Sequence, residues 1–321
     1  MHLPSPAVRV PVTVPVGATA LRPTWFELPR ELRGLIEGRL GRRVVDAASQ
    51  GSGYTPGFAS RLLLEDGDRV FVKAADLATR SMFAESYRDE ARKLAALPPG
   101  VPAPRLRWAY DADGWVVLCL EDIAGRPPVR PWRRTELLAA VDAVTAMSLH
   151  LTPAPDALSL PSWAAELDSF PSYWDRFQPD PFVAAHGSET RQLAMSGLAA
   201  GAGDTMVHCD LRDDNILVDE AGSVWICDWN WPVRGAAWID LLTLLIGARG
   251  DGHDVDAILR SNSITNGVLP ADIDGVLALL AVYFLGAKEA EAPATSPWIR
   301  VHQRWYAEVT WGWLAERRGW R

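Results

Sequence analysis

Cysteine is scarce in this sequence. The 321 residues include only Cys119, Cys209 and Cys227, and no two of them form a CxxC pair. This pattern predicts neither a disulfide framework nor a zinc site, and it is typical of a protein in a reducing compartment. Positive charge is also in deficit, because 32 Lys and Arg stand against 40 Asp and Glu, a net charge of -8. The deficit argues against a protein that binds nucleic acid through bulk positive charge.

Long apolar runs are missing as well. The longest uncharged apolar stretch, residues 275–287, is shorter than the roughly 20 residues that a membrane-spanning helix needs, so a buried helix is expected there. Near the N-terminus, residues 1–23 are interrupted by Pro4, Pro6, Pro11, Pro15 and Arg9, where a secretory signal would need an unbroken apolar run. We therefore expect a cytoplasmic protein without a membrane or nucleic-acid partner.

Proline-rich stretches punctuate the chain at residues 98–104 and 124–131. Proline removes a backbone donor and fixes φ, so such stretches interrupt regular structure. The length favours about two domains, and the second stretch is the better candidate for their boundary. The expected organisation is an N-terminal extension (1–40), a first lobe (41–123) and a second lobe (124–321).

The first lobe carries strand and turn signals. Five strands are expected, at residues 44–49, 58–64, 69–74, 105–110 and 115–120. Residues 81–97 contain good helix formers and no Gly or Pro, which predicts one helix. The second lobe is expected to be mostly helical, with an amphipathic helix at 134–151 and a strand-loop-strand block at 204–229. Together these elements predict an α+β protein, with a five-stranded sheet and one helix in the smaller lobe.

The block at 204–229 holds the most informative polar residues. Asp210 opens a loop that contains Asn215, apolar runs flank this loop, and Asp228 follows the apolar run after the Gly222 turn. If the two flanking runs pair as strands, the three side chains can come to one edge of a hairpin. Such an oxygen cluster suits Mg²⁺, which takes one or two protein ligands plus substrate phosphates. A carboxylate outside the metal shell could accept a hydroxyl proton.

Three motifs of this region resemble the aminoglycoside phosphotransferase family, a branch of the protein-kinase-like superfamily. They are His208-x-Asp210-x-x-x-x-Asn215, Ile226-x-Asp228-Trp229 and Gly235 with Asp240-Leu241. The resemblance covers about residues 44–246 and implies a two-lobed fold with the nucleotide between the lobes. Its small lobe would hold an antiparallel sheet, and its large lobe would carry the catalytic loop, the metal and the substrate.

The resemblance also assigns roles within this block. It implies that Asp210 is the catalytic base or the carboxylate that orients the acceptor hydroxyl. Asn215 and Asp228 would be the Mg²⁺ ligands. His208 and Asp240 would support the loop. Each of these roles is carried over from the family motif.

Further roles follow from the resemblance in the first lobe. Lys73 would reach the α- and β-phosphates of ATP or GTP, and Glu90 would pair with it, although Glu85 competes for that place. The loop Gly51-Ser52-Gly53 would cover the phosphates. The backbone of the hinge, at Glu121 and Ile123, would bind the nucleotide base.

The chain departs from the family pattern at three points. The glycine-rich loop reads G-x-G-x-x-x-G over residues 51–57 rather than G-x-G-x-x-G. Cys209 stands where the family has glycine, and Ala236 where it has aspartate. The positions of Cys209 and Ala236 are more structural than chemical in the expected mechanism, so these two departures affect the substrate assignment more than the reaction class.

The function expected from the resemblance is transfer of the γ-phosphoryl group of ATP or GTP to a hydroxyl of a small molecule. The acceptor would be an aminoglycoside or a similar antibiotic or metabolite. Alternatives are a kinase of the choline, homoserine or sugar type and a catalytically silent nucleotide-binding module. A protein kinase is less attractive, because Asp228-Trp229-Asn230 replaces Asp-Phe-Gly. Asp213 and Asp214 could face a cationic acceptor or could lie in a solvated loop.

Overall fold

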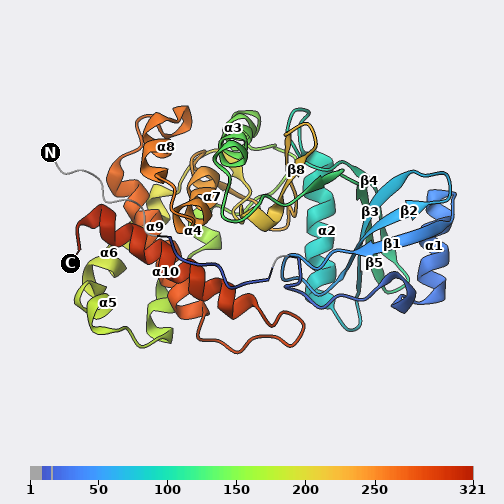
Figure 1. Ribbon diagram of the computed structural model, residues 1–321, viewed down its shortest axis with the longest axis horizontal. Coiled ribbons are helices and arrows are strands. Elements are labelled where there is room, and N and C mark those ends of the chain that lie inside the picture. Colours follow the sequence, from blue (N-terminus) through green and yellow to red (C-terminus); the bar gives the residue numbers. More distant parts are fainter. Residues whose placement is uncertain (1–8, 16, 321) are drawn as a thin grey trace.

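A computed structural model describes residues 9–15 and 17–320 of the chain. It has two lobes at opposite ends of its long axis (Figure 1). The smaller lobe contains β1 (Val44–Ser49), β2 (Phe58–Leu64), β3 (Arg69–Asp76), β4 (Leu106–Ala112), β5 (Trp115–Glu121) and α2 (Ser81–Ala96). The five strands pair antiparallel in the order β1-β2-β3-β5-β4. The predicted strands, helix and α+β class are thus confirmed, with boundaries that differ by no more than two residues.

The sheet is covered on both faces. The helix α2 packs on the face toward the second lobe, and η1 (Trp25–Glu27) and α1 (Arg30–Leu40) cover the outer face (Figure 1). Because both faces are covered, the central residues 116–120 of β5 are all buried instead of alternating with exposed ones. Trp25, Leu32 and Ile36, which fall within the predicted N-terminal extension, thus belong to the core of the first lobe.

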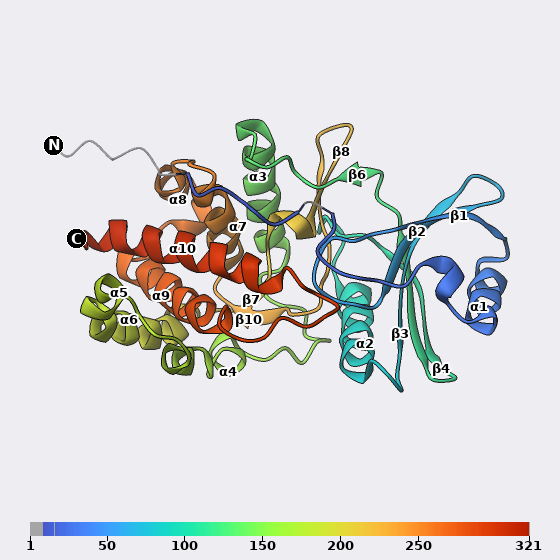
Figure 2. The same ribbon diagram turned by 60° about the horizontal axis from the view of Figure 1, so that its bottom comes forward.

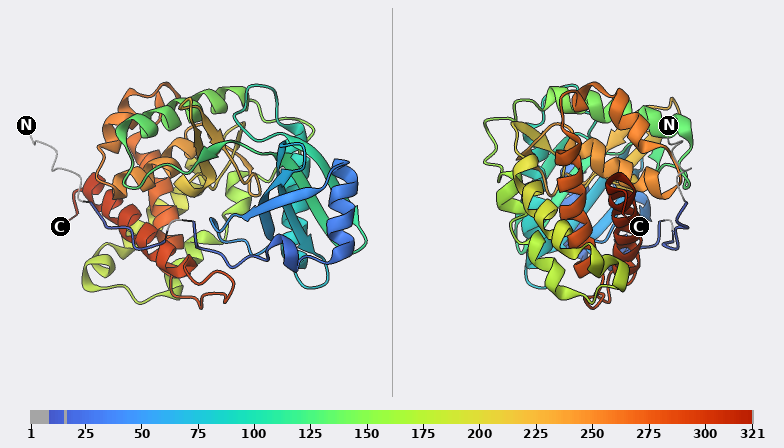
Figure 3. Two further views of the ribbon diagram at one scale, coloured as in Figure 1. Left: turned by 45° about the vertical axis from the view of Figure 1, so that its right-hand side comes forward. Right: turned by 90° about the vertical axis from the view of Figure 1, so that its left-hand side faces the viewer.

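The segment before α1 crosses from one lobe to the other. In the second lobe, Val10 N–H donates to the Gly250 carbonyl at 2.8 Å. In the first lobe, Thr19 N–H donates to the Gly51 carbonyl at 2.8 Å. Figure 1 and the left view of Figure 3 both show this dark blue segment along the helices and then against the sheet. We call residues 9–15 and 17–24 the strap.

The second lobe is mostly helical, as expected. Its longer helices are α3 (Arg134–His150), α6 (Gly187–Ala200), α7 (Ile239–Gly250), α8 (Val255–Ser261), α9 (Pro270–Ala287) and α10 (Ile299–Arg318). Shorter turns are α4 (Trp163–Glu166), η2 (Phe170–Arg176), α5 (Pro181–Ala185), η3 (Asp213–Asn215) and η4 (Ser263–Thr265). The helices α6, α9 and α10 gather at the end away from the sheet (Figure 3).

Two small sheets lie where the lobes meet. One pairs β7 (Thr205–Val207) with β10 (Val233–Gly235), and the other contains β6 (Gly125–Arg126), β8 (Ile216–Asp219) and β9 (Val224–Ile226). Figure 2 shows β6 and β8 between the first-lobe sheet and the helices. The pairing of β8 with β9 confirms the predicted strand-loop-strand block. The loop between β7 and β8 is held at one end by this pairing and at the other end by the pairing of β7 with β10.

The apolar stretch 275–287 lies inside α9, which begins five residues earlier at Pro270. Within the described residues, α9 is the one helix that is long and apolar enough to be a candidate membrane span, and 72% of that segment is buried in the fold. The burial is that of a core helix, as the sequence predicted.

We expect the contact between α6 and α9 to tolerate no added atom at Gly197. A Cβ there would lie 2.3 Å from the Gly275 carbonyl oxygen, closer than van der Waals contact allows. Gly197→Ala should therefore force the helices apart and lower the free energy of unfolding by about 1–3 kcal/mol, as overpacking does in other cores. Urea unfolding measures the loss. Gly312→Ala, where a Cβ meets nothing within 4 Å, is the control and should not destabilise the protein.

Candidate active site

A pocket of about 240 Å³ lies between the two lobes. The first lobe contributes β2, β3, α2 and the glycine-rich loop, and the second lobe contributes the loops next to β8 and β9. Of the site residues predicted from the sequence, eight line this pocket: Ser52, Gly53, Lys73, Glu90, Glu121, Ile123, Asn215 and Asp228. Side chains that are more than a hundred residues apart in the sequence are thus brought to one cavity.

A buried ion pair lies at the centre of the pocket. Lys73 Nζ, on β3, donates to both carboxylate oxygens of Glu90 at 2.7 and 2.8 Å and to Asp228 Oδ1 at 2.8 Å. The Glu90 side chain, on α2, is only 1% exposed. Glu85 pairs instead with Arg88 at the surface, so the geometry favours Glu90 over Glu85.

Two negative charges control the ionisation of Lys73. Burial opposes its charge, but Asp228 and Glu90 outweigh burial and raise the pKa of Lys73. Burial likewise raises the pKa of Asp228, and the positive charge of Lys73 more than offsets this, so the pKa of Asp228 is lowered. At neutral pH the pocket therefore holds a charged lysine against a charged aspartate.

The loop after β7 is held by Asp240 at the start of α7. Its carboxylate accepts the backbone N–H of His208 at 2.8 Å and that of Cys209 at 3.0 Å. The His208 ring nitrogen Nε2 lies 2.9 Å from the Cys227 carbonyl oxygen, which ties the loop to the end of β9. Cys209 has a φ of 68°, the left-handed region that glycine adopts most easily. This explains why glycine suits that position in the family motif.

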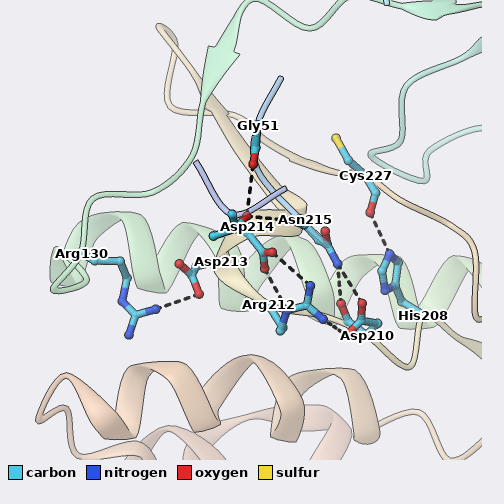
Figure 4. Close-up of polar contacts among 11 residues, drawn as sticks. Gly51, Arg130, His208, Asp210, Arg212, Asp213, Asp214, Asn215 and Cys227 are labelled. Atoms are coloured by element: carbon cyan, nitrogen blue, oxygen red, sulfur yellow. Dashed lines mark hydrogen bonds and ion pairs between the residues drawn. The ribbon is translucent and has the colours of Figure 1, made fainter. Parts of the chain in front are cut away.

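Asp210 lies in the same loop and faces two other polar side chains (Figure 4). Its carboxylate accepts hydrogen bonds from Arg212 and, at 3.3 Å, from Asn215 Nδ2. Arg212 also makes a two-pronged ion pair with Asp214, at 2.9 and 3.0 Å. Burial raises the pKa of Asp210 to about 6, although Arg212 acts in the opposite direction. The importance of Arg212 was missed from the sequence.

Asn215 and Asp228 fit the requirements of a Mg²⁺ site. The Asn215 amide donates through Nδ2 to the Asp210 carbonyl at 2.8 Å, which leaves its oxygen for other partners. Asp228 accepts from Lys73 through Oδ1, and no described residue donates to its Oδ2. The hydrogen bond from Cys227 N–H to the Asn215 carbonyl, 2.8 Å long, brings the two residues side by side. Two hard oxygen donors beside open space are what Mg²⁺ needs when phosphates and water complete its shell.

The hinge is shaped by Arg61. Its guanidinium donates to the carbonyls of Ile123 and Gly125 at 2.9 and 3.0 Å and pairs with Asp122. The Ile123 carbonyl also accepts Gly125 N–H at 2.7 Å, so this oxygen is already engaged. No described residue accepts a hydrogen bond from Ile123 N–H. A base at the hinge would therefore meet this N–H rather than the carbonyl.

The glycine-rich loop is fastened to the strap. Gly51 does not line the pocket: a Cβ on it would lie 2.3 Å from the Gly17 carbonyl oxygen, so glycine is required there by the strap. Ser52 and Gly53 do line the pocket. In this loop, Gly51 therefore packs against the strap, whereas Gly53 lines the pocket.

Asp213 and Asp214 are neither a solvated loop nor free to face a cation. Asp213 pairs with Arg130 at 2.8 Å, and Arg130 also pairs with Asp251 at 2.7 Å. Asp214 pairs with Arg212. The sequence did not reveal these arginines as partners, because Arg130 is 83 positions away from Asp213.

Aromatic side chains cluster where η2 packs against α9. Phe170 of η2 stacks on Tyr283 of α9 with ring centroids 4.2 Å apart, and Tyr173 packs on Tyr283 at 5.0 Å. Burial raises the pKa of the Tyr283 phenol, and the charges of Tyr173 and Asp210 act in the same direction. This ring therefore lies within electrostatic reach of Asp210.

Comparison with known proteins agrees with this geometry. The model of the phosphotransferase enzyme family (APH) matches residues 55–272. No curated protein sequence matches the chain at a significant level.

Solved structures share the fold at low sequence identity. Aminoglycoside phosphotransferase APH(4)-Ia, in complex with ADP and hygromycin B, superposes with a TM-score of 0.60 at 13% identity, over 89% of this chain and 98% of that one. Choline kinase LicA from Streptococcus pneumoniae gives 0.58 at 15% identity, over 89% and 98%. Spectinomycin phosphotransferase APH(9)-Ia, with ADP and spectinomycin, gives 0.57 at 13% identity, over 90% and 98%. These likenesses confirm the two-lobed, kinase-like fold.

Proposed function

Because this chain belongs to the phosphotransferase enzyme family, we propose that it transfers the γ-phosphoryl group of ATP or GTP to a hydroxyl of a small molecule. A phosphotransferase with an alcohol group as acceptor is the reaction class of the family. The observation that carries the proposal for this chain is the buried contact of Lys73 with both Glu90 and Asp228. It lies in the same pocket as Asn215 and next to the loop of Asp210.

The division of labour that we propose is electrostatic. Lys73, held by Glu90, would orient the phosphates, and Asn215 and Asp228 would hold Mg²⁺, which supplies positive charge against the phosphates when bound. The hinge N–H of Ile123 would bind the edge of the base. Ser52 and Gly53 would lie over the phosphates. Little covalent chemistry is asked of the protein.

Asp210 would align the acceptor hydroxyl and receive its proton. The loop that carries it is fixed by Asp240 and His208, so its carboxylate is held in place before the acceptor arrives. Its hydrogen bond from Asn215 links the acceptor side to the metal side of the site. His208 and Asp240 are thus positioning residues in this proposal.

The acceptor that we propose is an aminoglycoside or a similar antibiotic. Two solved structures of the same fold are named as complexes with hygromycin B and spectinomycin. The stacked rings of Phe170 and Tyr283 add an apolar surface, and Tyr283 lies within electrostatic reach of Asp210. Because Asp213 and Asp214 pair with arginines, stacking on these rings rather than attraction to these two carboxylates would hold the acceptor.

A choline-type acceptor is the second candidate. Aromatic faces attract quaternary ammonium groups, and the aromatic cluster of Phe170, Tyr173 and Tyr283 supplies such faces. The Tyr173 face is already covered by the Arg176 guanidinium, 3.8 Å from the ring centroid. The positive charge of Arg176 repels an ammonium group, so a choline-type acceptor is less favoured than an antibiotic.

The test is a coupled assay of ADP or GDP release by the purified protein with Mg²⁺. Each nucleotide is offered with aminoglycosides, other hydroxyl-bearing antibiotics, choline, homoserine and sugars. We expect release that depends on one class of acceptor. Nucleotide binding without release for any acceptor, and without slow background hydrolysis, would support the silent nucleotide-binding module instead. We expect the enzyme to work in the cytoplasm, where the nucleotide is available.

A further inference from the structure

The strap brings an arginine into the pocket between the lobes. Arg22 lines this pocket together with Lys73, Asp228 and the glycine-rich loop. Its Nη2 donates to the Ser52 carbonyl at 2.8 Å, and its Nε is buried without a hydrogen-bond partner in the described part of the chain. Arg22 lies outside the residues 55–272 that match the family. The family pattern therefore gives no reason for an arginine here.

Arg22 differs from the other cations of the pocket in its charge balance. Lys73 pairs with Glu90 and Asp228, Arg61 pairs with Asp122, and Arg126 pairs with Glu136. No carboxylate among residues 9–15 and 17–320 lies within ion-pair distance of Arg22. Its one named acceptor is a neutral carbonyl. Among the described residues that line this pocket, Arg22 is thus the cation without an ion-pair partner.

The surroundings of Arg22 keep its charge close to the proposed phosphate site. Arg22 and Asp228 line the same pocket. A Cβ at Gly53, in the loop proposed to cover the phosphates, would lie 3.3 Å from Arg22 Nη2. Arg22 is therefore next to the loop and shares the pocket with the proposed metal ligand.

The strap also fixes where Arg22 can go. Three residues earlier, Thr19 Oγ1 donates to the carbonyls of Gly51 and Gly53, at 3.2 and 2.6 Å. Thr19 N–H and Ala20 N–H both donate to the Gly51 carbonyl, at 2.8 and 3.0 Å. On the other side, Leu21 N–H donates to the Thr295 carbonyl at 2.9 Å. Arg22 is presented from a backbone that is held on both sides, which lowers the entropy lost when its side chain binds a ligand.

We propose that Arg22 is a phosphate-binding residue of the nucleotide site, supplied by the strap. The inference rests on the proposed function, because it takes the pocket to be the site of a nucleoside triphosphate. An unpaired guanidinium beside a glycine-rich loop suits phosphate oxygens, which it binds through two parallel N–H donors. The polyphosphate would meet Lys73 from β3 and Arg22 from the strap. In this chain, the phosphates would thus contact a second cation in addition to the lysine that the family motif implies.

The test compares ligands that differ only in phosphate. Binding of ATP with Mg²⁺, of ADP with Mg²⁺ and of adenosine is measured by calorimetry for the unchanged protein and for Arg22→Gln. We expect the variant to bind ATP about tenfold more weakly, since a charge-assisted hydrogen bond of the usual strength is lost. The loss for ADP is smaller, and adenosine binds unchanged. Arg22→Lys recovers part of the ATP affinity because it restores the charge without the fork.

Two control variants separate the charge of Arg22 from its contact with the loop. Thr19→Val removes the side-chain hydrogen bonds to Gly51 and Gly53 but no charge, so it reports what loosening of the loop alone does. Arg30→Gln removes the same charge from the exposed start of α1 and should leave all three affinities unchanged. Thermal unfolding without nucleotide confirms that each variant is folded.

The possible results distinguish failure of this inference from failure of the proposed function. If the unchanged protein binds ATP and Arg22→Gln binds it equally well, this inference fails and the proposed function stands. The inference also fails if Arg22→Gln weakens adenosine as much as ATP, because the arginine then acts only through the loop. If the unchanged protein binds neither ATP nor GTP, both proposals fail.

Discussion

Replacing Asp210 by alanine should lower turnover by about a thousandfold or more while nucleotide binding stays nearly intact. The proposed role of this carboxylate is confined to the acceptor hydroxyl, so its loss removes an interaction made in the transition state and not one made with the nucleotide. A thousandfold loss corresponds to about 4 kcal/mol of transition-state stabilisation. The measurement is kcat for acceptor-dependent ADP or GDP release, together with the Kd of the nucleotide.

The environment of Asp210 makes a second variant necessary. Asp210 shares Arg212 with Asp214, so alanine leaves a buried guanidinium with one partner fewer. Asp210→Asn keeps the shape and an oxygen that can accept from Arg212, while it removes the negative charge and the ability to take a proton. Both variants should lose turnover alike. Unchanged turnover in Asp210→Asn would contradict the proposed role of this residue at the acceptor hydroxyl.

A matched control comes from the same loop. Asp213 follows Asp210 by three positions, is also an aspartate, and pairs with Arg130, whereas Asp210 pairs with Arg212. Asp213→Asn should therefore affect stability more than chemistry. If it lowers turnover as strongly as Asp210→Asn while the protein stays folded, the loop acts as a whole and Asp210 has no special part.

The sequence was a good guide wherever local signals decide the structure. The turn Asp111-Ala112-Asp113-Gly114 separates the two strands predicted at 105–110 and 115–120, and Asp and Gly tolerate the positive φ of 52° and 80° found at Asp113 and Gly114. The helix at residues 81–96 followed from good helix formers that end before Pro98. The order of motifs along the chain was enough to name the family and the fold.

Side-chain contacts between residues far apart in the sequence could not be predicted. Nothing near Asp213 in the sequence shows that Arg130 will neutralise it, and both residues read as exposed loop positions. The same holds for Arg61, whose contacts with the hinge carbonyls span more than sixty positions. The side-chain charges were visible in the sequence, but their compensation depends on the fold.

The strap was the hardest part to anticipate. Irregular segments carry no pattern that says what they contact. The sequence predicted that Gly51 belongs to a phosphate-covering loop, whereas in the structure Gly51 packs against the strap, where a Cβ would lie 2.3 Å from the Gly17 carbonyl oxygen. This contact between the loop and the strap was not predicted.

The second large effect is expected for Lys73. Lys73→Met removes the cation that offsets two carboxylates, one of them the almost fully buried Glu90. Breaking a buried ion pair from one side leaves an uncompensated charge and costs about 3–5 kcal/mol. We therefore expect a lower free energy of unfolding together with weaker binding of Mg²⁺–ATP and a loss of turnover of at least about a hundredfold. Urea unfolding, calorimetry and the coupled assay measure the three effects.

A double variant separates the stability effect from the chemistry. Adding Glu90→Gln to Lys73→Met removes the uncompensated carboxylate, so part of the stability should return while turnover stays low. The surface pair of Arg88 with Glu85 is the control: Glu85→Gln should change stability by less than about 1 kcal/mol, as exposed ion pairs usually do. If the double variant recovered turnover together with stability, Lys73 would be a structural residue, and the phosphates would depend on other cations of the pocket.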